Sequence, residues 1–272
     1  MSQTYRGPLK AVIFDWAGTV VDFGCRAPVE VFVRAFAAVG IRVDPAEARV
    51  PMGLPKWDHI KALGRQPAVA ERWERAHGRA MTDGDVDRLY GMFLPLSVAT
   101  VAEHATLIPG TLETVAALRS RRLAIGSTTG YGREIMDALM PAAVVQGYTP
   151  DCLVCPNQVP VGRPSPLMMY KAMLELGVYP AAAVVKVDDT QPGIEEGLAA
   201  GSWTVAVSVT GNEVGLSEAD WNALPAEERQ WRTEAAADRL RREGAHYVIG
   251  GVGDLMPVID DIEERLARGE RP

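Results

Sequence analysis

Short apolar runs alternate with helix-like stretches along most of this chain. Residues 10–15 form the first run, which ends in a carboxylate and a glycine-containing turn, a pattern typical of a buried parallel strand that leads into a functional loop. Comparable runs lie at residues 123–127, 152–154, 183–188, 203–209 and 247–249. Because helical stretches of about ten or more residues separate these runs, the chain is predicted to form an open, Rossmann-like α/β sheet.

Helix start and stop signals support this reading of the intervening stretches. Pro166 precedes a helical pattern at 167–176, and Pro192 with Gly193 precedes another at 194–200. Gly177 and Gly201 stand where glycines commonly end helices.

Residues 24 to about 100 break the alternation, because they contain only helical patterns. These patterns cover residues 29–39, 55–63, 69–79 and 86–99. We therefore expect an α-helical cap at 24–100, inserted into an α/β core formed by 1–23 and 101–272. A further charge-rich and periodic stretch, residues 221–242, is expected to be one solvated helix.

The charge balance narrows the classes of partner. The 272 residues carry a net charge of −7, which argues against a nucleic acid, because such binding needs a basic face. The chain has no apolar run of roughly 20 residues, the length needed to span a bilayer, and its three cysteines suit a reduced compartment. We expect a cytoplasmic protein without a membrane partner, although a small anionic ligand remains compatible with local positive charge.

Three carboxylates follow two of the predicted strands. Asp15 ends the first run, and Asp188 and Asp189 end the run at 183–188. In open α/β sheets functional residues gather at the carboxyl ends of strands, so these carboxylates are expected to lie together. Oxygen ligands suit a hard cation, and Mg²⁺ fits best. Strand geometry leaves open which Asp of the pair would bind it, and a turn-initiating Asp pair is the plainer alternative.

A second group of candidates has the chemistry to bind a phosphoryl group. Ser127, Thr128 and Thr129 end another predicted strand and supply hydroxyl and N–H groups for phosphoryl oxygens, although residues of this kind also cap helices. Arg163 offers a planar, two-pronged donor that could balance phosphate and carboxylate charge, with a plain surface role as the alternative.

The segment Asp15-Trp16-Ala17-Gly18-Thr19 resembles the D-x-x-G-T signature of the haloacid dehalogenase superfamily. The resemblance implies that Asp15 attacks phosphorus and that Asp189 ligates the metal directly, with Asp188 behind it. Many members carry an acid two residues after the nucleophile, where this chain has Ala17. That side chain cannot protonate a leaving group, although its backbone carbonyl can still ligate the metal.

Several further segments resemble the phosphonoacetaldehyde hydrolase family, also called phosphonatases. They span nearly the whole chain and lie at residues 15–19, 24–28, 51–59, 126–131, 146–148, 162–164, 175–180 and 201–204. The resemblance implies hydrolysis of a carbon–phosphorus bond in a small phosphonate, with Lys56 forming an imine that accepts the electrons of the breaking bond. It also implies a homodimer, for which the apolar helix at 29–39 is the candidate seam.

Other residues, most of them in the cap, resemble family pocket positions. His59 lies three residues after Lys56 and so shares its helix face, where it could assist proton transfer. Met52, Cys25 and Tyr131 also match pocket positions, although packing explains each of them nearly as well.

The choice of amine can be examined because the chain has few lysines. Lys10 and Lys186 precede the apolar runs of their strands and are expected toward the wrong end of the sheet. Lys171 lies in a core helix pattern, and Lys61 should face elsewhere on the helix of Lys56. Lys56 is the best candidate, and as a free nucleophile it needs a pKa below its usual value of about 10.4.

Two rival functions and one departure from the family pattern remain. The rivals are a phosphatase or phosphomutase acting on a small phosphate ester, which Ala17 disfavours, and a non-catalytic sensor of a phosphate ligand. Some relatives carry a further Asp a few residues beyond position 189, where this chain has Gln191-Pro192-Gly193. Asp188 is the candidate that could compensate.

Overall fold

The computed structural model describes residues 5–272 and places six strands of that range in one parallel sheet. The strands are β1 (Ala11–Phe14), β2 (Ala124–Thr128), β3 (Cys152–Val154), β4 (Val184–Asp188), β5 (Trp203–Val207) and β6 (Tyr247–Ile249). Their order is β3-β2-β1-β4-β5-β6. The predicted α/β class is confirmed, and each strand falls on one of the six apolar runs.

The strand order reverses beside β1. The chain adds β2 and β3 on one side and β4, β5 and β6 on the other, so β1 and β4 are neighbours at the switch point. Phe14 is in register with Ser127 of β2 and with Val187 of β4. Asp15 and Asp188, one residue further along, therefore lie at the same edge of the sheet, where open α/β sheets bind ligands.

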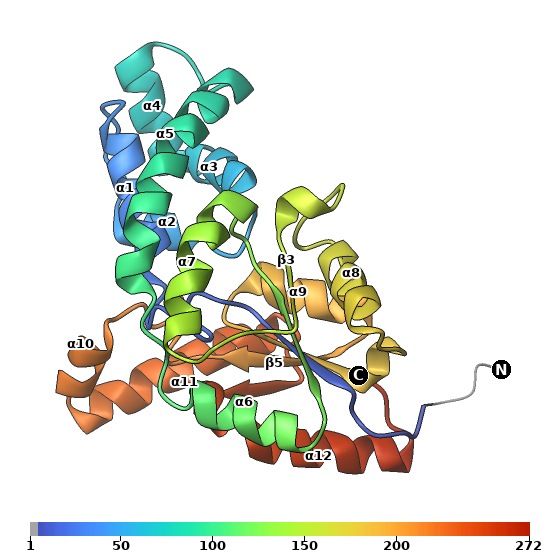
Figure 1. Cartoon of the computed structure of the whole chain (residues 1–272). Helices are drawn as coiled ribbons and strands as arrows, with labels where there is room; N and C mark the ends of the chain where they lie inside the picture. The colour runs from blue at the N-terminus through green and yellow to red at the C-terminus, as the bar shows by residue number, and fades with distance from the viewer. Residues whose placement is uncertain (1–4) are drawn as a thin grey trace.

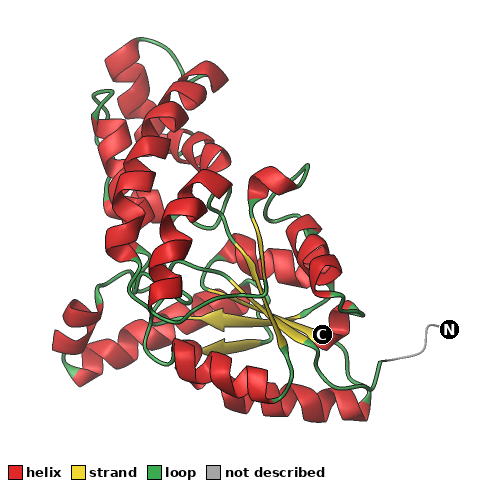
Figure 2. Cartoon of the chain, in the orientation of Figure 1, coloured by secondary structure: helices red, strands yellow, loops and turns green. Residues whose placement is uncertain are grey.

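Helices cover both faces of the sheet (Figure 2). In β1, Ala11 and Ile13 join an apolar cluster with Met168 of α8, while Val12 and Phe14 join the larger cluster on the opposite face. This division follows from the alternation of side chains along a strand and explains why these strands are apolar throughout. The helices are α6 (Thr111–Ser120), α7 (Arg133–Val145), α8 (Leu167–Leu176), α9 (Gln191–Ala200), α11 (Ala226–Arg242) and α12 (Leu255–Arg268).

A group of helices lies between β1 and β2 in the chain. They are α1 (Arg26–Ala37), α2 (Pro45–Arg49), α3 (Lys56–Gly64), α4 (Pro67–His77) and α5 (Asp83–Val101). Figure 1 shows them, in blue to green, beyond one end of the sheet. Helix α5 packs against α1 and α3 and also against α7. The division into a cap at 24–100 and a two-part core remains a prediction.

The two chain crossings between these helices and the sheet lie side by side. The Asp22 N–H donates to the Thr106 carbonyl at 3.2 Å, and the Ile108 N–H donates to the Val20 carbonyl at 2.9 Å. The short 3₁₀ turn η1 (Ala102–His104) begins the return crossing. Similar turns lie elsewhere at η2 (Pro156–Gln158), η3 (Ala181–Ala183) and η4 (Val252–Asp254).

The expectation of one helix over residues 221–242 is wrong in its boundaries. The structure has α10 (Glu218–Ala223) and α11, separated at Leu224 and Pro225. Leu224 adopts an extended conformation with ψ 146°, because a residue before proline is disfavoured in helical geometry. The predicted helix ends are confirmed at Gly177 and Gly201, which adopt the left-handed conformation. Within residues 5–272 no helix is both long and apolar enough to cross a membrane.

Candidate active site

Three carboxylates meet at the shared edge of β1 and β4. Asp15, Asp188 and Asp189 each offer an oxygen atom, and these atoms lie within 4.8 Å of one another. Asp189 is fully buried and accepts hydrogen bonds from the Asn212 N–H at 2.8 Å and the Thr19 hydroxyl at 3.2 Å. Burial and the nearby charges of Asp15 and Asp188 raise the pKa of Asp189 well above its usual range. A bound cation would relieve this repulsion.

Gly18 allows Asp189 to approach the loop that follows β1. Its φ is +89°, and a Cβ at this position would lie 2.2 Å from Oδ2 of Asp189. Any other residue would therefore displace the carboxylate as well as strain the backbone. The glycine of the Asp15-to-Thr19 motif is required by the geometry of the site.

Arg163 contacts three carboxylates at once. Its Nη1 lies 2.9 Å from Oδ1 of Asp15, its Nη2 lies 3.1 Å from Oδ2 of Asp188, and its Nε lies 3.0 Å from Oε2 of Glu196. Nη2 also donates to the Thr128 carbonyl at 2.8 Å. Since each Nη carries two hydrogens, one Nη1–H is not used in these contacts, and Arg163 lines the adjoining cavity.

The pKa of Asp15 reflects this mixture of neighbours. Burial, followed by the charge of Asp188, raises it to about 6, against the lowering effect of Arg163. The carboxylate is therefore held between a repelling and an attracting charge. Any further cation beside it would favour the ionised, nucleophilic form.

The expected position of Lys186 is wrong. It lies inside β4 and is fully buried, with Nζ at 2.7 Å from Oγ1 of Thr128, 3.0 Å from Oδ2 of Asp188 and 3.3 Å from Oε2 of Glu196. Lys186 and Glu196 thus complete a buried ionic network that also contains Arg163. A lone lysine within an otherwise apolar run was the signal for it, since a buried charge requires a partner.

The three hydroxyl residues that follow β2 are used differently. The Ser127 hydroxyl donates to the carbonyl of the last residue of β1 at 2.9 Å, and the Thr128 hydroxyl donates to Glu196 at 2.8 Å. Thr129 is the one of the three that lines the cavity, where its Oγ1 accepts from the Tyr131 N–H at 3.1 Å. Phosphoryl binding by these residues stays a prediction, for which Thr129 has the best placement.

Gly193, in the segment that departs from the family pattern, lies against the Asp188 carboxylate. A Cβ at Gly193 would lie 2.0 Å from the Asp188 carboxylate. The Asp188 carboxylate therefore occupies the space that a side chain at position 193 would need. Its Oδ1 accepts hydrogen bonds from the N–H and the hydroxyl of Thr190, at 3.0 Å and 2.8 Å.

Lys56 approaches these carboxylates from the first turn of α3. Its side chain is 6% exposed, and Nζ lies 4.9 Å from the ring centre of Tyr131 and 5.7 Å from that of Phe32. Nζ makes no hydrogen bond or ion pair with residues 5–272. Burial lowers the pKa of Lys56 to about 8, although the charges of Cys25 and Asp15 oppose the shift.

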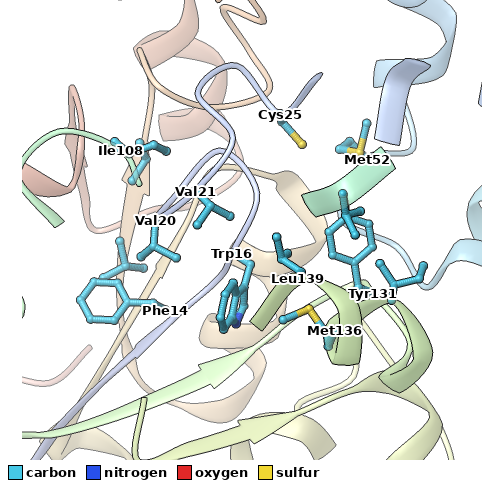
Figure 3. Packing of buried hydrophobic residues seen from close by; sticks show 14 of the residues in the cluster. Phe14, Trp16, Val20, Val21, Cys25, Met52, Ile108, Tyr131, Met136 and Leu139 are labelled. Atoms are coloured by element: carbon cyan, nitrogen blue, oxygen red, sulfur yellow. The ribbon is translucent and has the colours of Figure 1, made fainter. Parts of the chain in front are cut away.

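One small cavity is lined by both Lys56 and Asp15. Its volume is about 20 Å³, roughly the room for one water molecule. Three of the residues that line it, Cys25, Met52 and Tyr131, come from separate segments of the chain and are labelled in Figure 3. Among the predicted site residues, those that line it are Asp15, Ala17, Cys25, Met52, Lys56, Thr129, Tyr131 and Arg163.

His59 lies behind Lys56 and outside the lining of this cavity. Its Nε2 is 2.9 Å from the Ala48 carbonyl, which can only accept, so Nε2 carries the hydrogen and Nδ1 has a free lone pair. Its ring stacks on Phe32 with centroids 3.7 Å apart. Burial and the charge of Lys56 lower the pKa of His59 well below its usual value, so the ring is neutral. Nδ1 has no partner among the described residues.

Comparisons with known proteins agree with this arrangement. Residues 9–201 match the family model described as haloacid dehalogenase-like hydrolase, so the chain belongs to that class of hydrolases. It is 51% identical over 264 residues to the phosphonoacetaldehyde hydrolase of Paraburkholderia phytofirmans, covering 97% of this chain and 99% of that protein. The relative of the same name in Hahella chejuensis is 49% identical over 268 residues, covering 98% of this chain and 91% of that protein.

A solved structure extends the likeness to three dimensions. The phosphonoacetaldehyde hydrolase-like protein from Oleispira antarctica superposes with a TM-score of 0.98 at 46% identity, covering 100% of this chain and 99% of that one. Within the haloacid dehalogenase-like class, the chain therefore belongs to the phosphonoacetaldehyde hydrolase family.

Proposed function

We propose that this chain hydrolyses the carbon–phosphorus bond of phosphonoacetaldehyde, giving acetaldehyde and phosphate. The observation that carries the proposal is the shared cavity of Lys56 and Asp15, an amine and a carboxylate, with Ala17 at the position of the superfamily's usual acid. A site without that acid suits a leaving group that needs no proton on oxygen. The names of the full-length relatives support the same reaction.

In this proposal Lys56 provides the electron acceptor. Its neutral amine attacks the aldehyde carbon and water is lost, which gives an imine. The electron pair of the breaking carbon–phosphorus bond then moves into the imine and produces an enamine. Protonation of the enamine carbon and hydrolysis of the imine release acetaldehyde and free the amine. The lowered pKa of about 8 supports this role, because a protonated lysine cannot attack.

Asp15 accepts the phosphoryl group in the same scheme. An oxygen of Asp15 forms a bond to phosphorus as the carbon–phosphorus bond breaks, and water then hydrolyses the resulting aspartyl phosphate. The spare Nη1–H of Arg163 is available to a phosphoryl oxygen, and Thr129 lies at the same cavity. We also propose that His59, whose neutral ring has a free Nδ1, assists proton transfer at Lys56.

The donor set fits a magnesium ion. Asp15, Asp188 and Asp189 offer oxygen atoms close together, which suits a hard cation, and the backbone carbonyl of Ala17 is a further candidate ligand. When bound, Mg²⁺ would reduce the repulsion between the Asp15 carboxylate and the phosphonate. The repulsion that raises the pKa of Asp189 supports a cation at this position.

A phosphate-release assay with phosphonoacetaldehyde, run with and without Mg²⁺, tests the proposal. We expect release that depends on Mg²⁺ and much slower release from phosphate monoesters of similar size. Comparable turnover of the esters would favour a phosphatase or phosphomutase instead. Binding of the phosphonate without any release would favour a sensor.

Three other expectations stay within this proposal. The homodimer is one of them, and sedimentation would measure it directly. Val29, Phe32 and Phe36 of α1 are buried within the chain itself, so they are not exposed to form its interface. Cytoplasmic location can be tested by fractionation. The cap boundaries at 24 and 100 can be tested by expressing the core with a short linker in place of those residues.

A further inference from the structure

A single arginine connects the helices inserted after β1 to the loop that follows β5. Arg49 is the last residue of α2, and its guanidinium donates to main-chain carbonyls of two separate segments. Nη1 lies 2.9 Å from the carbonyl oxygen of Gly24, and Nη2 lies 2.9 Å from that of Gly215. Such contacts from a charged donor are stronger than neutral hydrogen bonds.

Asn212 carries this contact to the candidate metal site. Its side-chain oxygen accepts from Nη1 of Arg49 at 3.2 Å, and its Nδ2 donates back to the Arg49 carbonyl at 3.2 Å. The backbone N–H of the same Asn212 donates to Oδ2 of Asp189 at 2.8 Å. One residue therefore contacts both the arginine of α2 and the carboxylate of the site.

The backbone around these contacts leaves little room for rearrangement. Gly215 has a φ of +67°, and a Cβ there would lie 2.6 Å from the Cζ of Arg49. Nearby, the inserted helices meet the loops at the edge of the sheet, and this contact is called the seam below. There, a Cβ on Gly53 would lie 2.2 Å from Oγ1 of Thr190. Both glycines sit where a side chain would separate the inserted helices from the sheet.

The closed seam is also too tight for a ligand. The cavity between Lys56 and Asp15 has a volume of about 20 Å³, which is smaller than any substrate that contains both a phosphoryl group and an aldehyde. Binding of such a substrate against both Lys56 and Asp15 therefore requires the inserted helices to move away from the sheet beside Gly53. Arg49 spans that seam at its edge.

We infer that Arg49 is a positioning residue that holds the inserted helices closed over the site and, through Asn212, sets the orientation of Asp189 in the closed state. When the seam parts, the contacts of Arg49 with Asn212 and Gly215 are lost together. Asp189 then loses the support of the loop that carries Asn212. Closure and correct placement of this carboxylate are thus one event, and the catalytic part of this inference rests on the proposed function.

Hydrogen exchange of the ligand-free protein tests the contact without any assumption about activity. Arg49→Met should speed exchange at the amides of Gly24 and Asn212 by about tenfold to hundredfold, the loss expected for charge-assisted hydrogen bonds. The Asp15 amide, which donates to the Val187 carbonyl within the sheet, should be unchanged. Unchanged exchange at Gly24 and Asn212, or a uniform increase that includes Asp15, would overturn the inference.

Kinetics give the second readout. Arg49→Met should lower kcat/KM for phosphonoacetaldehyde by about tenfold to hundredfold, and Arg49→Lys should recover only part of it, because a lysine lacks the fork that reaches two segments. Arg75→Met is the matched control, since the exposed side chain of Arg75 pairs with that of Glu71 one turn away on α4. Full recovery by lysine would overturn the inference. If the wild type released no phosphate, the proposed function would fail, while the exchange pattern would still decide the role of Arg49.

Discussion

Two buried lysines lie on opposite sides of the candidate site and differ in their partners. Lys186, in β4, is fully buried with three oxygen atoms of Thr128, Asp188 and Glu196 within 3.3 Å of its Nζ. Lys56, in α3, is nearly as buried, yet its Nζ faces aromatic rings and has no hydrogen bond or ion pair within the described residues.

The comparison shows that the same type of side chain can either stabilise a charge network or provide a neutral amine, depending on its partners. On the sheet side, pairing stabilises charges, so that carboxylates, arginine and lysine form a fixed ionic network. On the side of the inserted helices, burial without a partner disfavours the ammonium and makes a neutral amine accessible near pH 8. The site therefore combines a charged half suited to a phosphoryl group with an amine suited to a carbonyl.

The largest effect is expected from a change in the charged half. Asp15→Asn should lower phosphate release by on the order of 10⁴-fold, because an amide is a poor nucleophile and a poor metal ligand. Phosphate release is the measurement, and circular dichroism should show an intact fold. Activity near that of the wild type would remove Asp15 from the role of nucleophile.

The matching change in the other half is Lys56→Arg. Borohydride added with acetaldehyde should attach a two-carbon group to Lys56 of the wild type, and mass spectrometry locates it. The arginine variant should lose both the label and the turnover, since a guanidinium keeps its charge and forms no imine. Lys61→Arg is the control, because Lys61 lies on the same helix and pairs with Asp83. A label on Lys61 or Lys171 would contradict the assignment.

Replacing each lysine by methionine should change stability in opposite directions. Lys186→Met leaves Asp188 and Glu196 with an uncompensated charge and should cost about 3–5 kcal/mol. Lys56→Met removes a charge that burial penalises and should raise the free energy of unfolding at pH 7 by up to about 3 kcal/mol. Urea unfolding of both variants measures the contrast. Equal losses would mean that the two lysines have equivalent environments.

The pH dependence follows from the lowered pKa of Lys56. The amine is the reactive form, so imine formation should rise with pH, approach tenfold per unit well below pH 8, and level off above about 8. Borohydride trapping with acetaldehyde at different pH values gives the profile. A rate that is flat between pH 6 and 9, or that rises only near pH 10, would show that burial does not lower this pKa.

The smallest effect is expected at Tyr131. Its hydroxyl is buried and has no hydrogen-bond partner within the described residues, so Tyr131→Phe removes no interaction and should change stability by less than about 1 kcal/mol. The ring over Lys56 remains, and the pH profile should keep its midpoint. A shift of that midpoint would mean that the hydroxyl, rather than burial alone, tunes the amine.

Local patterns determined the strands and most of the candidate site. Apolar runs ended by Asp15 and by Asp188 place these residues at the edge of a parallel sheet, because strand burial and the carboxyl-end rule depend on short segments. The split between α10 and α11 was also encoded, in Pro225, but the charge periodicity of that stretch obscured it.

Only the tertiary structure decided how the charges are paired. Lys186 and Glu196 are separated from Arg163 by more than twenty residues, and their contact depends on the register of β4 and on the packing of α9. The contact between Arg49 and Asn212 joins segments 163 positions apart. The sequence by itself determined which residues have reactive chemistry, since that depends on side-chain type and local pattern. Which of them are paired, and hence which lysine can be neutral, depends on distances that form only when the chain folds.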